Sequence, residues 1–511
     1  RTSGAQCQVW VEAVVGMARQ LVALVALIRH GQRAPYPPPD GDSAADPNKW
    51  SPRSFPGPAA WNMSAEAFAA QLLTPRGKQL QLHLGGYFAS RLEGSACDSR
   101  VSLIADSSVR DVESATHFAR GFFPPKCASR VARLIVANAS SDPPLLPVVN
   151  DHAFAGCAGP SASEVELSYG GQYDAMVQAY APQIRRLSAL IRCCSPALCA
   201  SYAAPPNCTL ADLPHAYSGV YFDGFYTGPL AVAGYFSNAF MLQALSDVAP
   251  YAWGEASLDE LVELYQVHQR VMWLGAQLNS SRAYGSHTLA YMLASLEQIV
   301  SDAPLRGLAD ASLRPEGNAS RQLLLALFGH DFNLLYARRL LEVSWVTDSW
   351  NFDAAVPGTS LVLELYLDGG EWHVVAALLA ASVEQQREAR PLVAPHEAPP
   401  RAVILDEPYA RFKRRVLEAI DVECVLEPLR TTVRSMAAAT PPAAGGWQGV
   451  GVDGLVGVVL GALLVGALAG VLLGRARNRQ PSAARTPIIG DVATSSMAID
   501  HKGRRQEGHD A

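Results

Sequence analysis

The sequence predicts an α/β fold, with a central, mostly parallel sheet flanked by helices, an inserted helical subdomain and a single C-terminal transmembrane helix. Three observations support this prediction. Apolar runs that do not alternate with polar residues occur within 21–28, 100–110 and 321–331, as in strands buried on both faces. Helical patterns dominate about 165–304. Residues 454–474 hold 21 residues without a charge.

The composition limits the classes of function. The chain has 511 residues, of which 49% are apolar and 17% charged, and its net charge is -6. This length suits one large or two ordinary domains. Because no basic face or long charge run is present, the sequence excludes nucleic acid as a partner. We assign no function to residues 1–20.

The segment 454–474 is predicted to cross a membrane. As a helix it spans about 31 Å, close to the thickness of the bilayer's hydrocarbon core. The basic sequence RARNR follows it, which places the tail 475–511 in the cytosol. A buried core helix is the alternative, but the Ala/Pro/Gly-rich stalk 431–453 precedes the segment and disfavours it. The chain is therefore expected to be a type I membrane protein.

The part before the membrane segment has the marks of a lumenal or extracellular domain. All nine cysteines precede residue 454, in what would be an oxidising compartment. Cys193, Cys194, Cys199 and Cys208 lie within 16 residues; they are consistent with a zinc site or with a disulfide-pinned loop, and the compartment favours the loop. Five N-x-S/T sequons are candidates for glycosylation: Asn62, Asn138, Asn207, Asn279 and Asn318.

The remaining elements follow from local patterns. The first strand ends at Gly31 and Pro35, and a helical stretch over 65–94 is broken at Pro75. Alternation on both sides of Asp368-Gly369-Gly370 predicts a β-hairpin over 360–378. The other expectations are an irregular segment over 380–408 and a short basic helix over 412–420.

Each of the three apolar runs ends in charged or polar residues. The first runs into Arg29-His30-Gly31-Gln32-Arg33, the second into Arg110-Asp111 and the third into His330-Asp331. Ligands of parallel sheets bind beyond the carboxyl ends of the strands. Because a cluster of buried cations is costly without an anion, these ends predict a site for a tetrahedral dianion such as phosphate, whose oxygens match guanidinium groups.

These residue types also predict a chemistry. A neutral, oriented histidine is a competent nucleophile toward phosphorus. Arginines can neutralise the charge of the transition state, so no metal is needed. A neutral aspartic acid beside the site can protonate the leaving oxygen.

Four blocks of the sequence resemble a known family. RHGQRAP resembles the R-H-G-x-R-x-P signature of the histidine acid phosphatases, and GHDFNL resembles their distal His-Asp motif. SVRDVESATHFARGFFPP resembles the segment that supplies their third phosphate-binding arginine, and SLVLELYLDGGEWHV resembles their C-terminal hairpin. The resemblance covers about 21–430 and implies the phosphoglycerate-mutase-like fold of the histidine phosphatases.

The resemblance implies hydrolysis of small phosphate monoesters at acidic pH, without cofactor or metal. His30 would form a covalent phosphohistidine and Asp331 would be the proton donor. Arg29, Arg33, Arg110 and His330 would bind phosphate. The resemblance further implies a disulfide between Cys157 and Cys424. The layout is similar to that of membrane-bound lysosomal and protozoan acid phosphatases, which implies an endosome, a lysosome or the cell surface, and it is compatible with a homodimer.

Two departures from the family pattern bear on the substrate. Ala34 stands where phytase-like members carry an aromatic residue, and Gln32 stands where Asp or Ala is common. A broad phosphomonoesterase is therefore favoured over a phytase. A catalytically inactive glycoprotein that acts as a receptor or adhesin is the alternative from another class. His83, His117, His152 and His268 are interpreted as structural or surface residues.

Overall fold

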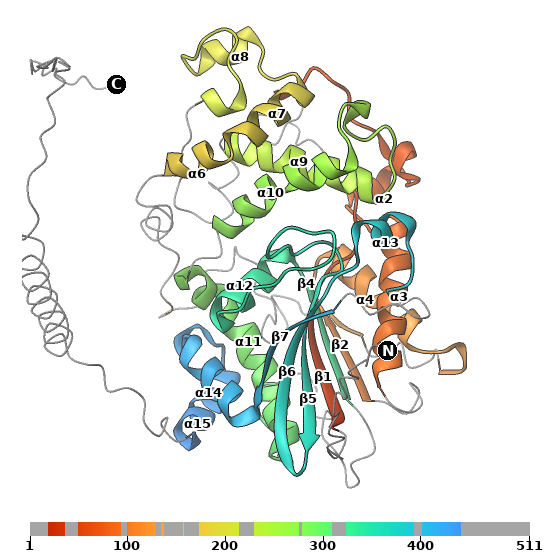
Figure 1. The fold of residues 1–511 in the computed structure, drawn as a ribbon. Coiled ribbons are helices and arrows are strands. Elements are labelled where there is room, and N and C mark those ends of the chain that lie inside the picture. Colours follow the sequence, from red (N-terminus) through yellow and green to blue (C-terminus); the bar gives the residue numbers. More distant parts are fainter. Residues whose placement is uncertain are drawn as a thin grey trace, which may run out of the picture. The chain divides into compact units, whose positions relative to one another are not determined.

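The protein is built on one mixed β-sheet (Figure 1). The computed structural model describes residues 19–35, 50–92, 100–127, 134–136, 157, 173–213, 229–274, 278–308, 323–392 and 401–440. Seven strands form the sheet in the order β3-β2-β4-β1-β5-β6-β7. Their bounds are β1 Gln20–Arg29, β2 Arg100–Ala105, β3 Leu134–Val136, β4 Leu323–Gly329, β5 Ser360–Asp368, β6 Glu371–Leu379 and β7 Arg401–Pro408.

The sheet is less parallel than the sequence predicts. Strands β1 to β4 pair in parallel, whereas β5, β6 and β7 extend the sheet through three antiparallel pairings. The predicted hairpin accounts for one of these three pairings, that of β5 with β6. Gly369 and Gly370 connect β5 to β6 with φ of 59° and 93°, and so tight a connection can only join antiparallel neighbours.

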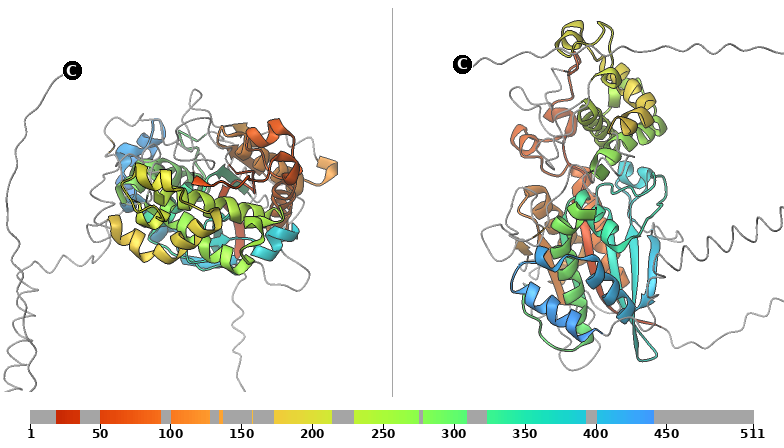
Figure 2. Two further views of the ribbon diagram at one scale, coloured as in Figure 1. Left: turned by 90° about the horizontal axis from the view of Figure 1, so that it is seen from above. Right: turned by 90° about the vertical axis from the view of Figure 1, so that its left-hand side faces the viewer.

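Helices cover both faces of the sheet and one of its ends (Figures 1 and 2). Helices α3 and α4 pack on one face, and α11, α12, α14 and α15 cover the other. Helices α6 to α10 lie beyond one end of the sheet in Figure 1. The bounds are α2 Ala65–Ala69, α3 Pro75–Arg91, α4 Val109–Phe122, α6 Tyr173–Ala179, α7 Ala181–Ile191, α8 Pro196–Ser201, α9 Pro229–Leu245, α10 Leu258–Leu274, α11 Leu278–Val300, α12 Asp331–Leu341, α13 Val383–Glu388, α14 Tyr409–Ala419 and α15 Leu429–Ala439, with short 3-10 turns at Pro58–Trp61, Leu210–Asp212, Tyr251–Gly254 and Val422–Cys424.

Burial on both faces explains why the central strands are apolar without alternation. In β1, Val25 and Leu27 belong to the core under α11 and α12, whereas Ala26 and Ile28 belong to the core under α3 and α4. Strand β4 divides in the same way, residue by residue. Because neighbouring residues point to opposite faces, a strand between two helical layers needs apolar side chains at every position.

Two segments differ from the sequence-based predictions. The segment 380–408, predicted to be irregular, contains α13 and β7. The first part of the predicted stalk belongs to α15, whose Leu429, Val433 and Met436 are buried. Their i, i+4, i+7 spacing gives that helix an apolar face, which packs on the core.

The predicted membrane segment lies outside the described residues. Residues 1–18, the rest of the stalk, the span 454–474 and the tail 475–511 lie outside them. Within the part of the chain that the structure describes, no helix is both long and apolar enough to cross a bilayer.

Three disulfides join cysteines of the described residues. Cys199 bonds to Cys208, Cys193 bonds to Cys194, and Cys157 bonds to Cys424 across 267 residues, the last being the pair that the family resemblance implies. The cysteine cluster is therefore oxidised in this structure and offers no thiolates to zinc.

The sequons differ in exposure. Asn62 and Asn207 are exposed, whereas Asn279 is half-buried on α11 and Ser281 of its sequon is fully buried. Asn138 and Asn318 lie outside the described residues. Glycosylation stays a prediction.

A glycine on α3 allows the helix to approach the loop after β1. A Cβ added to Gly77 would lie 2.1 Å from the carbonyl oxygen of Gln32, whereas one added to Gly86 would meet nothing nearer than 3.8 Å. We expect Gly77→Ala to lower the free energy of unfolding by about 1–3 kcal/mol. Chemical denaturation measures it, with Gly86→Ala as the matched control on the same helix. Equal stability of the two variants would contradict the close approach.

Candidate active site

The parallel pairing of β1 with β4 brings the two histidine motifs together. Its register sets Arg29 beside Gly329, and the backbone N–H of His30 donates to the carbonyl oxygen of Gly329 at 2.8 Å. The rings of His30 and His330 consequently lie edge to face, with centroids 5.5 Å apart. The prediction that these strand ends are neighbours is correct.

His30 is held with one ring nitrogen available. Its Nδ1 lies 2.9 Å from the carbonyl oxygen of Gly31. A carbonyl only accepts, so Nδ1 carries the proton and Nε2 keeps its lone pair. Burial, reinforced by the charges of Arg110 and Arg29, holds the pKa of His30 well below its usual range. The ring is therefore neutral, which is the state that a nucleophile requires.

Arg110 reaches the site from a helix, and not from a strand end as predicted. Strand β2 ends at Ala105, and Arg110 lies in the first turn of α4. Its Nη2 is 3.5 Å from Nδ1 of His330. Asp106, Ser107 and Ser108 separate the strand from the helix, and such residues favour turns and helix starts over strand interiors.

His330 is oriented by a residue that the sequence analysis missed. Asp106 directly follows β2, and its Oδ2 accepts from Nε2 of His330 at 2.8 Å. This contact keeps Nε2 protonated and turns Nδ1 toward Arg110. A carboxylate immediately after an apolar strand was the available signal, since polar residues at that edge of the sheet face the site.

Asp331 is paired with Arg29 in this structure. Its Oδ2 lies 2.9 Å from Nη2 of Arg29. Burial alone would raise the pKa of Asp331, but the charge of Arg29 and the contact with His268 outweigh it and hold the pKa below its usual range. In this resting arrangement Asp331 is an anion and cannot donate a proton. An anion that takes over Arg29 would weaken the pair and let Asp331 gain its proton.

Two residues of α10 also reach this pair. The Tyr265 hydroxyl lies 3.4 Å from Nη1 of Arg29, and Nε2 of His268 lies 3.9 Å from Oδ2 of Asp331. Both side chains are buried, and their rings stack. His268 is therefore not a surface residue, and its position beside Asp331 is compatible with the structural role that the sequence analysis allowed. No local pattern could reveal it, because the contact with Asp331 depends on where α10 lies relative to the sheet.

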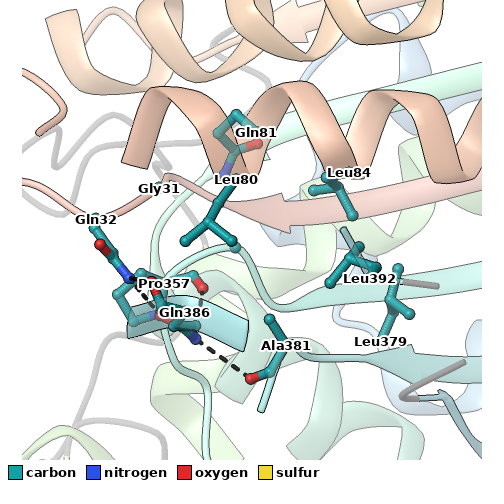
Figure 3. Close-up of a pocket in the computed structure, with 11 residues that line it drawn as sticks. Gly31, Gln32, Leu80, Gln81, Leu84, Pro357, Leu379, Ala381, Gln386 and Leu392 are labelled. Carbon is teal, nitrogen blue, oxygen red and sulfur yellow. Dashed lines mark hydrogen bonds between the residues drawn. The ribbon is translucent and has the colours of Figure 1, made fainter. Parts of the chain in front are cut away.

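Gln32 is one of the departures from the family pattern. It anchors the segment that follows His30 by hydrogen bonds to Gln386. Its Nε2 donates to the backbone oxygen and to Oε1 of Gln386 at 3.2 and 3.1 Å. Gln386 donates in turn to the carbonyl oxygens of Pro357 and Ala381. Figure 3 shows this network at the edge of a small pocket that also contacts Gly31. The charged side chains of the site do not line this pocket.

The described residues offer little to a metal ion. Two groups have suitable spacing, namely Cys194 with Cys199 and Cys208, and Asp106 with Asp111 and His330. The sulfurs of the first are in disulfides. The second lies beside Arg110 and Arg33, whose charges oppose a cation. We assign no metal site.

A mixed sheet between helical layers carries a neutral His30 close to the buried Arg29 and Arg33. This combination is what the resemblance to the histidine phosphatases implies. The sequence model of the histidine phosphatase superfamily (branch 2) matches residues 20–383. The chain belongs to this family.

Several phytases of known structure share this fold. That of Hafnia alvei in complex with tartrate has 20% sequence identity and a TM-score of 0.64, over 80% of this chain and 99% of that one. The phytase from Citrobacter braakii has 19% identity and a TM-score of 0.63, over 80% and 100%. The Klebsiella sp. ASR1 phytase has 19% identity and a TM-score of 0.61, over 81% and 97%. No curated protein sequence matches the chain.

The lowered pKa of His30 predicts activity at low pH. A histidine whose pKa is below its ordinary value of about 6.5 stays neutral as the pH falls past that value. We therefore expect the acid limb of kcat/KM, which reports groups of the free enzyme, to lie below about pH 6.5. The pH profile with 4-nitrophenyl phosphate measures it. An acid limb at or above that value would show that His30 is not kept neutral.

Proposed function

We propose that the protein is an acid phosphatase that hydrolyses phosphate monoesters through a phosphohistidine on His30. The observation that supports this most is the state of His30, which is neutral, buried and held by Gly31 with Nε2 available. Arg29, Arg33, Arg110 and His330 would hold the phosphate oxygens. The positive charge of the three arginines matches a dianion, and guanidinium groups suit its geometry.

The reaction would take two steps. Nε2 of His30 forms a bond to phosphorus while the bond to the ester oxygen breaks, and Asp331 protonates the leaving oxygen. Water then attacks phosphorus, Asp331 takes its proton, and His30 is released with inorganic phosphate. The substrate itself prepares Asp331, because a dianion bound to Arg29 competes with the carboxylate. Acidic pH helps this proton uptake.

Phytase activity is the second candidate. It is favoured by the solved structures described above that share the fold, which are phytases. Ala34, in place of an aromatic residue, argues for the broader activity. A kcat/KM for phytate well above that for simple monoesters would decide for the phytase. The inactive receptor or adhesin has less support, since every charged group of the proposed mechanism is present.

We further propose that this is a type I membrane glycoprotein. The uncharged segment 454–474 followed by basic residues supports it, as do the disulfides. The phosphatase domain would lie in the lumen of an endosome or lysosome, or at the cell surface. The proposed partners are small phosphomonoesters and the membrane. The layout of the chain is also compatible with a homodimer.

The nucleophile is tested by His30→Ala. Removing the imidazole should lower kcat for 4-nitrophenyl phosphate by about 10⁴-fold or more, because no phosphoenzyme can form. His83→Ala, a histidine on α3 away from the site, is the control and should keep its activity. The assay is run with and without a chelator, which should change nothing. Comparable activity of the two variants would overturn the proposed nucleophile.

The proton donor is tested by the leaving-group dependence of Asp331→Asn. We expect phosphoenzyme formation to slow by about 100-fold or more with an alkyl phosphate, whose alkoxide needs a proton. With 4-nitrophenyl phosphate, the loss should be much smaller, because nitrophenolate leaves without help. Rapid-quench measurement of the phosphoenzyme compares the two. Equal slowing would remove Asp331 from this role.

A further inference from the structure

Asp111 is a buried carboxyl group that the proposed mechanism does not use. It lies in the first turn of α4, next to Arg110, and is 0% exposed. Its Oδ2 is 3.5 Å from Nε2 of His330. Among the described residues, neither of its oxygens accepts a hydrogen bond. A buried ionised carboxylate without donors is costly, so this environment favours the neutral acid.

Two carboxyl groups face a single N–H. Nε2 of His330 has one proton, which it donates in a hydrogen bond to Asp106 at 2.8 Å. Asp111 lies farther from the same nitrogen, at 3.5 Å, and receives no hydrogen bond from it. The groups that face Asp111 come from three parts of the fold: His330 after β4, Arg110 on α4 and Asp106 after β2, with Arg33 after β1 acting from farther along the site. Burial raises the pKa of Asp111 to about 7, because it outweighs the charges of His330 and Arg110, and Asp106 adds to the rise.

We propose that Asp111 is a positioning residue that ties anion binding to pH. The inference rests on the proposed function, because it concerns the same phosphate site. Neutral Asp111 leaves the positive charge of Arg110 available to a dianion. Ionised Asp111 puts a negative charge against His330 and opposes binding. Asp106 already accepts the one proton on Nε2 of His330, so the second carboxylate gains no hydrogen bond there to compensate.

Sulfate is the probe that isolates this effect. It is a dianion across the whole range of interest, so any pH dependence of its binding comes from the protein. We expect the Kd of sulfate for the full chain to rise at least tenfold between about pH 6 and about pH 8. In Asp111→Asn, which keeps the shape of the side chain without its charge, the rise should shrink to less than about threefold. Isothermal titration calorimetry measures both without requiring turnover.

A matched control separates this site from a general change in charge. Glu113→Gln removes a carboxylate two residues away on α4, one that instead accepts from the backbone N–H of Leu73. It should keep the wild-type pH dependence. The same pH dependence in Asp111→Asn as in the wild type would overturn the role of Asp111, while leaving the phosphate site in place. Failure of the wild type to bind sulfate at any pH would reject the anion site, and with it this inference.

Thermal stability gives an independent readout. A folded-state pKa above the unfolded value means that the folded protein binds more protons between the two values, so stability falls as pH rises through that window. Asp111→Asn removes this loss. Its Tm, relative to the wild type, should therefore increase between about pH 4 and about pH 7. A constant difference in Tm across this window would show that Asp111 ionises as it does in the unfolded chain, and would contradict the proposal.

Discussion

The parallel pairing of β1 with β4 is the constraint on which the site depends. Both strands are buried on both faces, so a slip of one residue would send each side chain into the wrong core. The register therefore resists change. It sets Arg29 beside Gly329, and the residues that follow, His30 and His330, inevitably meet. The precision of the site comes from the packing of the sheet, while the loops after the strands contribute the reacting groups.

The resting site balances its own charges. Arg29 is paired with Asp331, and His330 with Asp106, so the buried polar groups of the site have partners within the protein. This balance links binding to chemistry. In the proposed mechanism, a phosphate dianion would displace Asp331 from Arg29. The pKa of Asp331 would then rise, and the carboxylate could take up the proton that it needs as an acid. The ion pair between Arg29 and Asp331 would thus also keep the acid unprotonated until the substrate binds.

Local patterns predicted the elements that carry strong signals and missed those defined by distant contacts. The buried strands and the hairpin at Gly369-Gly370 were readable because apolar runs and paired glycines have few alternatives. Arg110 was misplaced because the strand pattern was extended across Asp106, Ser107 and Ser108, which begin a helix instead. Strand β7 was missed because it is an edge strand with partial burial, and its apolar pattern is correspondingly weak.

The sequence by itself determined the candidate site residues of the two histidine motifs and the strands that they follow, because buried strands and the motifs after them are contiguous in the chain. Only the tertiary structure decided how these groups are tuned. Asp106 meets His330 across 224 residues, and Tyr265 meets Arg29 across 236. The pairing of Asp331 with Arg29 and the isolation of Asp111 arise in the same way. Electrostatic tuning depends on distance and burial in space, and neither is encoded in the spacing of residues along the chain.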